Sequence, residues 1–437
     1  MFKRKAQKII SDYLDSNDER ILVIDGARQI GKSYIIRNVC KEKYKNYIEI
    51  NLQEDFDGDK LFANVSSITS FYFQLSMLYG NKLNNREDTL IFLDEIQVYP
   101  KLFSLLKPLR YDNRYRYIAS GSLLGVTLKK AFIPMGSIFQ YHMFPMDFEE
   151  FLWANNVGND VINYLKECYQ NKTEIDENIH KTMLIYFKRY LISGGLPDAI
   201  SALVNDMNIQ KVRNIQKDIY QYYQDDSSKY DQENKLKISR IYSLLPSYME
   251  NKVKRIRANQ ISSKNKDYLV NYQDEFDYLI SSGISLAVKA ISDPKFPLIQ
   301  SMNKNLIKLY YNDVGILSNI LFSSNVQAIL NMDKGMNLGS VYETACAMEL
   351  KAHGHELYYY DQKKVGEVDF LIDDYENLSV LPLEIKSGND QTNFRALPKL
   401  LANNEYHIKE GIVLGNKNIV KKEDKLITLP IYMIMFL

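Results

Sequence analysis

The chain has 437 residues, which corresponds to two or three domains at about 150 residues per domain. Its 55 Lys and Arg residues oppose 54 Asp and Glu residues. This balance excludes a uniformly basic nucleic-acid coat and a strongly acidic tail protein, and leaves room for a local basic patch. A composition of 46% hydrophobic and 25% charged residues is ordinary for a globular protein with a sizeable core.

Cysteine usage and hydropathy indicate the compartment. Cys40, Cys168 and Cys346 lie far apart and form no CxxC pair, which favours buried thiols in a reducing compartment over disulfides or a zinc site. The opening MFKRKAQKIISDYL lacks the apolar core of a secretory signal. No stretch approaches the roughly 20 apolar residues that span a bilayer. We expect a cytoplasmic protein with no membrane partner.

The first 155 residues alternate between strand-like and helix-like runs. Helical patterns cover 32–43 and 65–80. Strand patterns cover 21–26, 47–52, 89–95, 116–121 and 138–144. Strands separated by helices predict a parallel sheet covered on both faces, so residues 1–155 are expected to form an α/β domain.

The middle of the chain is mainly helical. We expect a helical lid or linker region at 156–225, with the polar stretch YQDDSSKYDQENK (223–235) as a loop or boundary. Helical spacing then recurs, a second helix covers 272–280, and SLAVKAI reads as a strand. This succession predicts a winged-helix-like domain at 226–330.

Residues 331–437 change character again. A helix at 338–353 is followed by strands ELYYY, GEVDFLI and VLPLEIK, a helix near 392–402, and strand GIVLG. This α-β-β-β-α-β order predicts a compact mixed α/β domain.

A phosphate-binding loop stands between the first strand and the first long helix. It matches G-x-x-x-x-G-K-[ST] in the required strand–loop–helix context. Backbone N–H groups at the helix N-terminus would hold the ATP phosphates, while Lys32 meets the β- and γ-phosphates and Ser33 meets Mg²⁺. The nucleotide-binding residues are Gly26, Ala27, Arg28, Gln29, Ile30, Gly31, Lys32 and Ser33.

A pair of carboxylates ends the buried strand LIFLDE. Asp94 would hold Mg²⁺ and Glu95 would polarise the attacking water; the alternative is a pair that only caps a strand end. A strand-like segment lies between the loop and this pair, which indicates the P-loop class in which these strands are not sequence neighbours. Ser120, at the next strand end, is either a γ-phosphate sensor or simply a small residue.

With these motifs the sequence resembles the AAA-type ATPases of bacteria and archaea that carry a C-terminal domain of uncharacterised function. The resemblance extends from GARQIGKS, IFLDEIQ and ASGS through FPMDFEEFL, SGGLP, IKLYYNDVGILS and GSVYETACAMEL to EVDFLI and PLEIKSG, covering about residues 18–415. It implies an AAA+ module, a winged-helix-like middle and a restriction-endonuclease-like end. Relatives usually have Gly-Arg where this chain has Gly136-Ser137, so the residue that would act as an arginine finger is open. Arg110, Arg114 and Arg116 form either a replacement or a solvated basic face.

A second acidic pattern lies in the C-terminal part. Glu384 and Lys386 are two apart on one strand and share a face, and a short polar turn would place Asp369 opposite Glu384. This D…(D/E)-x-K pattern resembles restriction-endonuclease-like nucleases, in which Glu343 matches an additional acidic residue. Glu367 is either an extra ligand or a rim charge.

The resemblance implies phosphodiester cleavage, with Asp369 and Glu384 binding Mg²⁺, Lys386 acting on water or on transition-state charge, and Glu343 completing the metal shell. The alternatives are an inactive domain of the same fold and a mere surface ion pair between Glu384 and Lys386.

The sequence therefore predicts a Mg²⁺-dependent AAA+-type ATPase coupled to a nuclease-like domain that acts on nucleic acid or is regulated by it, with DNA as a candidate partner. The alternative is a regulatory switch ATPase whose C-terminal domain only binds DNA or protein. KVKRIR (252–257) is either a DNA-phosphate contact or a solvated basic loop. Assembly with further copies of the chain, or with a protein partner, is also expected from the resemblance.

Overall fold

The computed structural model describes residues 2–122, 124, 136–230, 235–250, 261, 269–331, 338–388 and 394–437. It divides into two compact units, each described by itself. The first contains Lys3–Phe144 with Ser281–Gly283, and the second contains Pro145–Ile280 with Ile284–Leu437. All three cysteines are buried free thiols, as the sequence predicted.

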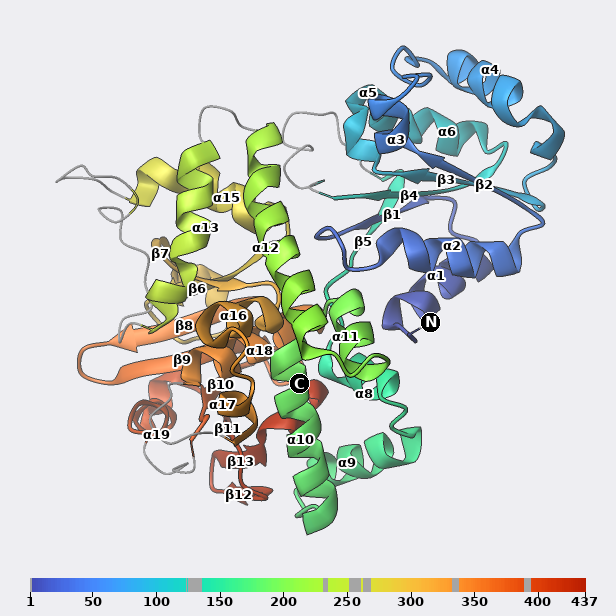
Figure 1. Ribbon diagram of the computed structural model, residues 1–437. Helices are drawn as coiled ribbons and strands as arrows, with labels where there is room; N and C mark the ends of the chain where they lie inside the picture. Colours follow the sequence, from blue (N-terminus) through green and yellow to red (C-terminus); the bar gives the residue numbers. More distant parts are fainter. Residues whose placement is uncertain are drawn as a thin grey trace. The chain divides into compact units, whose positions relative to one another are not determined.

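The first unit is built on a five-stranded parallel sheet in the order β2-β3-β4-β1-β5 (Figure 1). The phosphate-loop strand β1 and the carboxylate strand β3 are separated by β4, which confirms the predicted P-loop class. The strands are β1 Ile21–Asp25, β2 Asn46–Asn51, β3 Thr89–Asp94, β4 Arg116–Gly121 and β5 Ile138–His142. The helices are α1 Lys5–Asp15, α2 Lys32–Lys43, α3 Leu52–Asp57, α4 Ile68–Tyr79, α5 Pro100–Ser104 and α6 Leu106–Asp112.

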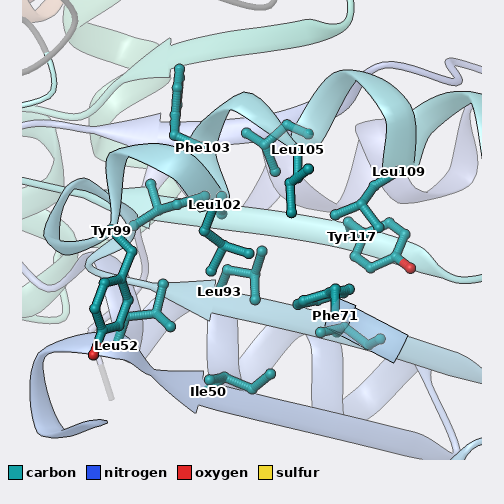
Figure 2. Packing of buried hydrophobic residues seen from close by; sticks show 14 of the residues in the cluster. Ile50, Leu52, Phe71, Leu93, Tyr99, Leu102, Phe103, Leu105, Leu109 and Tyr117 are labelled. Carbon is teal, nitrogen blue, oxygen red and sulfur yellow. The ribbon is translucent and has the colours of Figure 1, made fainter. Parts of the chain in front are cut away.

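Every residue of β1, β3 and β4 is buried, as expected for a parallel sheet covered on both faces. On one face, Phe71 of α4 and Leu102 of α5 pack over Leu93 of β3 in a single hydrophobic cluster (Figure 2). Alternate residues such as Phe92 point to the opposite face and are also fully buried. Burial of both faces holds the carboxyl ends of the strands, and the loops that follow them, in fixed positions.

The second unit contains an eight-stranded mixed sheet in the order β12-β13-β11-β10-β9-β8-β6-β7. Its strands are β6 Ser285–Ile291, β7 Met302–Tyr311, β8 Leu357–Gln362, β9 Gly366–Asp374, β10 Ser379–Ile385, β11 Gly411–Gly415, β12 Lys421–Glu423 and β13 Leu426–Pro430. Its helices are α8 Phe148–Ala154, α9 Asn159–Asn171, α10 Glu177–Ser193, α11 Pro197–Val204, α12 Ile209–Tyr230, α13 Lys235–Glu250, α15 Gln273–Ser281, α16 Val314–Phe322, α17 Gln327–Asn331, α18 Gly339–Ala352 and α19 Ala396–Ala402. The predicted α-β-β-β-α-β order is present as α18, β8, β9, β10, α19 and β11.

Two expectations about the middle of the chain change. The stretch 223–230 belongs to α12 and is not a loop, because Ile219, Tyr223 and Asp226 recur at helical spacing and are all buried. In addition, β6 and β7 form an antiparallel pair that joins the C-terminal strands through parallel pairing of β6 with β8. One sheet therefore crosses the domain boundary predicted at residue 330.

Two of the segments that carry the family resemblance meet inside the second unit. The Asp313 carboxylate caps α16 by accepting from the Ile316 N–H at 3.1 Å, and it also accepts from the Gly195 N–H at 2.6 Å. Gly194 has φ of +65°, and a Cβ there would lie 2.0 Å from Asp313, which excludes any other residue. SGGLP and NDVG are therefore two halves of one packing junction.

Candidate nucleotide site and C-terminal acidic cluster

The phosphate loop leaves β1 and turns directly into α2. Gly26 has φ of +139°, and a Cβ there would lie 2.2 Å from the Met143 carbonyl oxygen. Gly31 is the N-cap of α2 and is left-handed, with φ of +93°. Both positions require glycine. The loop thus brings backbone N–H groups and the N-terminus of a twelve-residue helix to one place, which is the arrangement that binds phosphate.

Lys32 is folded along this loop and is 5% exposed. Its Nζ donates to the carbonyl oxygens of Gly26 and Ala27, at 2.9 and 2.7 Å, and to Ser122 Oγ at 3.1 Å. Burial lowers the pKa of Lys32, against the opposing effect of the Glu95 and Asp94 carboxylates. Among the described residues, the ammonium group at the loop is therefore bonded to neutral oxygens.

Asp94 ends β3 beside the loop, as predicted. Its carboxylate accepts hydrogen bonds from the hydroxyls of Ser120 and Ser33, and burial raises its pKa. A carboxylate next to a serine hydroxyl supplies the hard oxygen ligands that Mg²⁺ prefers, with water completing the shell. These residues fit an Mg²⁺ site. Because the Ser120 hydroxyl is hydrogen-bonded to Asp94, Ser120 lies beside the residues that fit Mg²⁺.

Glu95 is turned out of the strand by a left-handed backbone, with φ of +55°. It accepts hydrogen bonds from Gln97 and, at 3.2 Å, from the Ser122 hydroxyl. Burial alone raises the pKa of Glu95, but Lys32 and Arg28, together with these hydrogen bonds, outweigh it and hold the pKa below its ordinary value. Glu95 is therefore a carboxylate at neutral pH and can accept a proton from water.

Ser122 is the functional candidate that the sequence did not assign. It links Lys32 to Glu95 through one hydroxyl, whereas only Ser120 of the ASGS segment was singled out. Ser120 lies in β4 and Ser122 directly follows this strand, and a spacing of two along extended backbone places both side chains on one side of the chain. The spacing of two between Ser120 and Ser122 is the sequence signal that points to Ser122.

The positions proposed for an arginine finger lie at the opposite end of the sheet. The Ser137 carbonyl accepts from Ile21 N at 2.9 Å, where β1 begins. The five residues of β1 separate this point from the phosphate loop by roughly 16 Å at about 3.3 Å per residue. Arg116, at the amino end of β4, is 7% exposed and donates to the carbonyls of Asp18 and Tyr13. It is neither a phosphate ligand nor part of a solvated basic face.

In the second unit the predicted hairpin is present. Strands β9 and β10 are antiparallel with Leu383 opposite Phe370, so the next pair along this register is Glu384 and Asp369. Asp369 Oδ2 accepts from the Ile385 N–H at 2.8 Å. Lys386 Nζ contacts Glu384 Oε1 at 2.7 Å. The three residues of the D…(D/E)-x-K pattern are therefore neighbours.

Further charges surround this trio. The Tyr310 hydroxyl donates to Glu343 Oε2 at 2.9 Å, and Lys308 of β7 is paired with Glu367. Burial raises the pKa of Glu384, Lys386 lowers it, and the nearby carboxylates of Glu343 and Glu367 raise it further. Four carboxylates and two lysines therefore form one cluster, which we call the C-terminal acidic cluster.

Two observations bear on metal binding at this cluster. Glu384 is 6% exposed, and its Oε2 has no hydrogen-bond partner within the described part of the chain. Across the same described residues, no three Asp, Glu, His or Cys side chains come together as ligands of a metal ion. The predicted neighbours are thus assembled without forming a complete ligand set.

Family comparisons agree with the nucleotide site. Residues 18–152 match the model of the AAA domain. The first unit therefore contains an AAA-type P-loop ATPase domain. Residues 185–327 and 338–434 match two domains of unknown function, DUF8612 and DUF4143. The AAA match supports ATP binding and hydrolysis as the activity of the first unit.

Solved structures show only distant similarity. A Walker-type ATPase of Pyrococcus abyssi is 14% identical, with 73% of this chain and 95% of that chain covered and a TM-score of 0.43. Thermotoga maritima RuvB is 13% identical, with 65% and 89% covered and a TM-score of 0.29. Hsp104 of S. cerevisiae is 12% identical, with 81% and 44% covered and a TM-score of 0.30. No relative among curated sequences matches the chain, and similarity this low carries no argument about function.

Among the described helices, none combines the length and apolar character that crossing a membrane requires. The basic segment KVKRIR at 252–257 lies outside the described residues. Its contact with DNA stays a prediction.

Proposed function

We propose that the protein hydrolyses ATP with Mg²⁺ at the phosphate loop and uses this turnover to change the state of its C-terminal domain. The observation that carries the proposal is the convergence of Lys32, Ser33, Asp94 and Glu95 at one edge of the parallel sheet. Together these four residues meet three requirements of phosphoryl transfer: Lys32 neutralises charge, Ser33 and Asp94 place the metal, and Glu95 orients the water.

The roles follow from the surroundings of each group. Lys32 exchanges its carbonyl partners for phosphate oxygens, because hydrogen bonds to charged acceptors are stronger than those to neutral ones. Ser33 and Asp94 would hold Mg²⁺, which neutralises phosphate charge when it is bound. Glu95 orients the water that attacks the γ-phosphate and receives its proton. The Ser122 hydroxyl holds the side chains of Lys32 and Glu95 in position relative to each other.

Titration calorimetry with MgATP tests the site. Wild-type protein is expected to bind, and Lys32→Ala to lose binding or turnover while its circular dichroism and melting curve stay native. Lys101→Ala removes an exposed lysine of the same unit and should behave as wild type. Full turnover in Lys32→Ala would refute the nucleotide site.

For the C-terminal domain we propose a restriction-endonuclease-like fold with metal-dependent cleavage of DNA as its candidate activity. This is supported by the order of α18, β8, β9, β10, α19 and β11 and by the placement of Asp369, Glu384 and Lys386. Glu384 offers a buried oxygen that has no hydrogen-bond partner among the described residues, and Mg²⁺ would satisfy it. In this activity Asp369 and Glu384 bind the metal and Lys386 stabilises the charge that develops on phosphate.

The alternative is a switch ATPase whose C-terminal domain binds DNA or protein without cutting. The described residues favour it in one respect, because Glu367 and Glu343 are already engaged by Lys308 and Tyr310. Incubation with linear, single-stranded and branched DNA in Mg²⁺ or Mn²⁺ separates the two. Cleavage that is lost in Asp369→Ala and Lys386→Ala, and retained in the exposed control Lys363→Ala, supports the nuclease. ATP turnover without cleavage of any substrate supports the switch.

We also propose that the active form contains more than one copy of the chain. Arg110 donates to the Gly136 carbonyl, and Arg114 comes just before β4 begins, so both lie at the end of the sheet opposite the phosphate loop of their own chain. A second copy is the proposed source of an arginine for the γ-phosphate. Light scattering with and without MgATP tests this assembly.

A further inference from the structure

We infer that Arg4 is a positioning residue for the phosphate loop, so that nucleotide affinity depends on the segment preceding α1. Arg4 lies before residues 18–152, the segment that matches the AAA domain. Its guanidinium is nevertheless bonded to the loop itself. The inference rests on the proposed nucleotide site and adds to it a residue from outside the matched segment.

The contact is direct. Arg4 Nη1 donates to the carbonyl oxygen of Ile30 at 2.9 Å, and Nη2 donates to the carbonyl oxygen of Phe144 at 2.8 Å. Ile30 belongs to the loop, and Phe144 follows β5. One rigid guanidinium therefore spans two backbone segments that are more than a hundred residues apart in the chain. Arg4 is 5% exposed, so these bonds are shielded from competing water.

Arg4 is itself held in place by α1. It is the N-cap residue of this helix, and its backbone N–H donates to Gln7 Oε1 at 3.1 Å while its carbonyl accepts from Gln7 N at 3.1 Å. Ala6 and Ile10 anchor the helix in the core, with 1% and 0% exposure. The helix thus serves as a rigid support for the side chain that reaches the loop.

The position of the Ile30 carbonyl explains how Arg4 can affect nucleotide binding. Ile30 and Gly31 share one peptide group, and in a planar trans peptide the C=O and the N–H point in opposite directions. When Arg4 fixes the Ile30 carbonyl, it also fixes the direction of the Gly31 N–H, away from the guanidinium. Gly31 is the N-cap of α2, where N–H groups face bound phosphate. The positive charge on the carbonyl side also polarises this peptide, which strengthens the N–H as a donor.

A positioning role and a purely structural role for Arg4 predict different experimental results. A structural tether would lower stability and leave nucleotide affinity intact. A positioning residue instead alters the cradle of the α- and β-phosphates. Its loss should weaken ATP and ADP equally and raise KM, with kcat nearly unchanged because Glu95 is not touched.

The chain offers a matched control. Arg116 is a second buried arginine of the same unit and also donates to two backbone carbonyls, at 2.8 and 3.0 Å. These carbonyls lie at the opposite end of the sheet from the phosphate loop. Arg4→Lys and Arg116→Lys each keep a positive charge and remove the two-pronged geometry, so their structural consequences are comparable.

Titration calorimetry with MgADP and MgATP on the full chain is the test, together with steady-state turnover and thermal melting. We expect Arg4→Lys to raise Kd about tenfold for both nucleotides and to raise KM with kcat within about twofold of wild type. Arg116→Lys should melt earlier and bind as wild type. Wild-type affinity in folded Arg4→Lys, or equal weakening in both variants, would overturn the inference. If wild-type protein itself does not bind nucleotide, the proposed function fails instead.

Discussion

Replacing Glu95 with glutamine separates ATP binding from ATP turnover. Glutamine has nearly the same size but cannot take a proton from water. The side chain is held by Gln97 and by the Ser122 hydroxyl, and the serine hydroxyl can rotate to meet the new amide. We therefore expect the fold, and the position of Lys32, to be retained. The change should affect the chemical step alone.

The size of the effect follows from the role of the residue. A positioned general base contributes about 10²–10⁴ in rate, which is about 3–5 kcal/mol of transition-state stabilisation. Lys32 and Arg28 hold the pKa of Glu95 below its ordinary value despite burial. The lowered pKa means that the base form persists as pH falls toward the ordinary range of a glutamate. Protonation of Glu95 should therefore not limit turnover of the wild type between pH 8 and pH 6.

The assay is phosphate release at saturating MgATP, paired with calorimetry. We expect kcat of Glu95→Gln to fall at least a hundredfold while the Kd for MgATP stays within about twofold. Glu54→Gln removes an exposed carboxylate on α3 of the same unit and should leave both quantities unchanged. A kcat for Glu95→Gln within about threefold of wild type would show that another group activates the water.

Three further outcomes test other contacts. Ser122→Ala removes the hydroxyl that is bonded to the charged groups of Lys32 and Glu95 and should lower kcat at least about tenfold, as expected for hydrogen bonds to charged groups; an unchanged kcat in phosphate release would contradict that link. Chelation by EDTA should stop ATP turnover and Mg²⁺ should restore it, whereas turnover that survives EDTA would exclude a metal on Ser33 and Asp94. His180, bonded to the Tyr432 hydroxyl at 2.9 Å, has a pKa lowered by burial. The folded state thus binds fewer protons than the unfolded state near pH 6.5, so its stability falls as pH drops through this range. Melting between pH 7.5 and 5.5 should show a larger decrease for wild type than for His180→Gln, and parallel decreases would refute the assignment.

Local patterns were sufficient to predict most of the first unit. The run ILVID followed by GARQIGKS identifies a buried strand, a loop and a helix, because glycines, periodicity and the lysine occur at fixed spacing. The apolar run of LIFLDE likewise predicts a buried strand, and β3 is buried and ends at Asp94. The neighbour relation of Glu384 and Asp369 also followed from a short turn and strand alternation.

What the sequence did not predict depends on contacts between distant residues. Arg4 reaches Ile30 and Phe144 only because α1 is packed in the core, and no local pattern marks that contact. The polar segment at 223–230 is helical because Tyr223 and Asp226 are buried by other elements, which overrides the local composition. The pairing of β6 with β8 likewise joins segments that hydropathy treats as separate domains.

The two acidic sites differ in how their lysines are engaged, and this difference separates what each can bind. Lys32 is bonded to carbonyl and hydroxyl oxygens, so an arriving triphosphate replaces neutral acceptors with charged ones and gains free energy. In the C-terminal acidic cluster, Lys386 and Lys308 are already paired with the carboxylates of Glu384 and Glu367. These lysines occupy Glu384 Oε1 and Glu367 Oε1, and Glu384 Oε2 has no hydrogen-bond partner among the described residues. Nucleotide binding thus gains free energy at Lys32 itself, whereas a metal ion in the C-terminal acidic cluster would gain it at Glu384 Oε2, the oxygen that Lys386 does not contact.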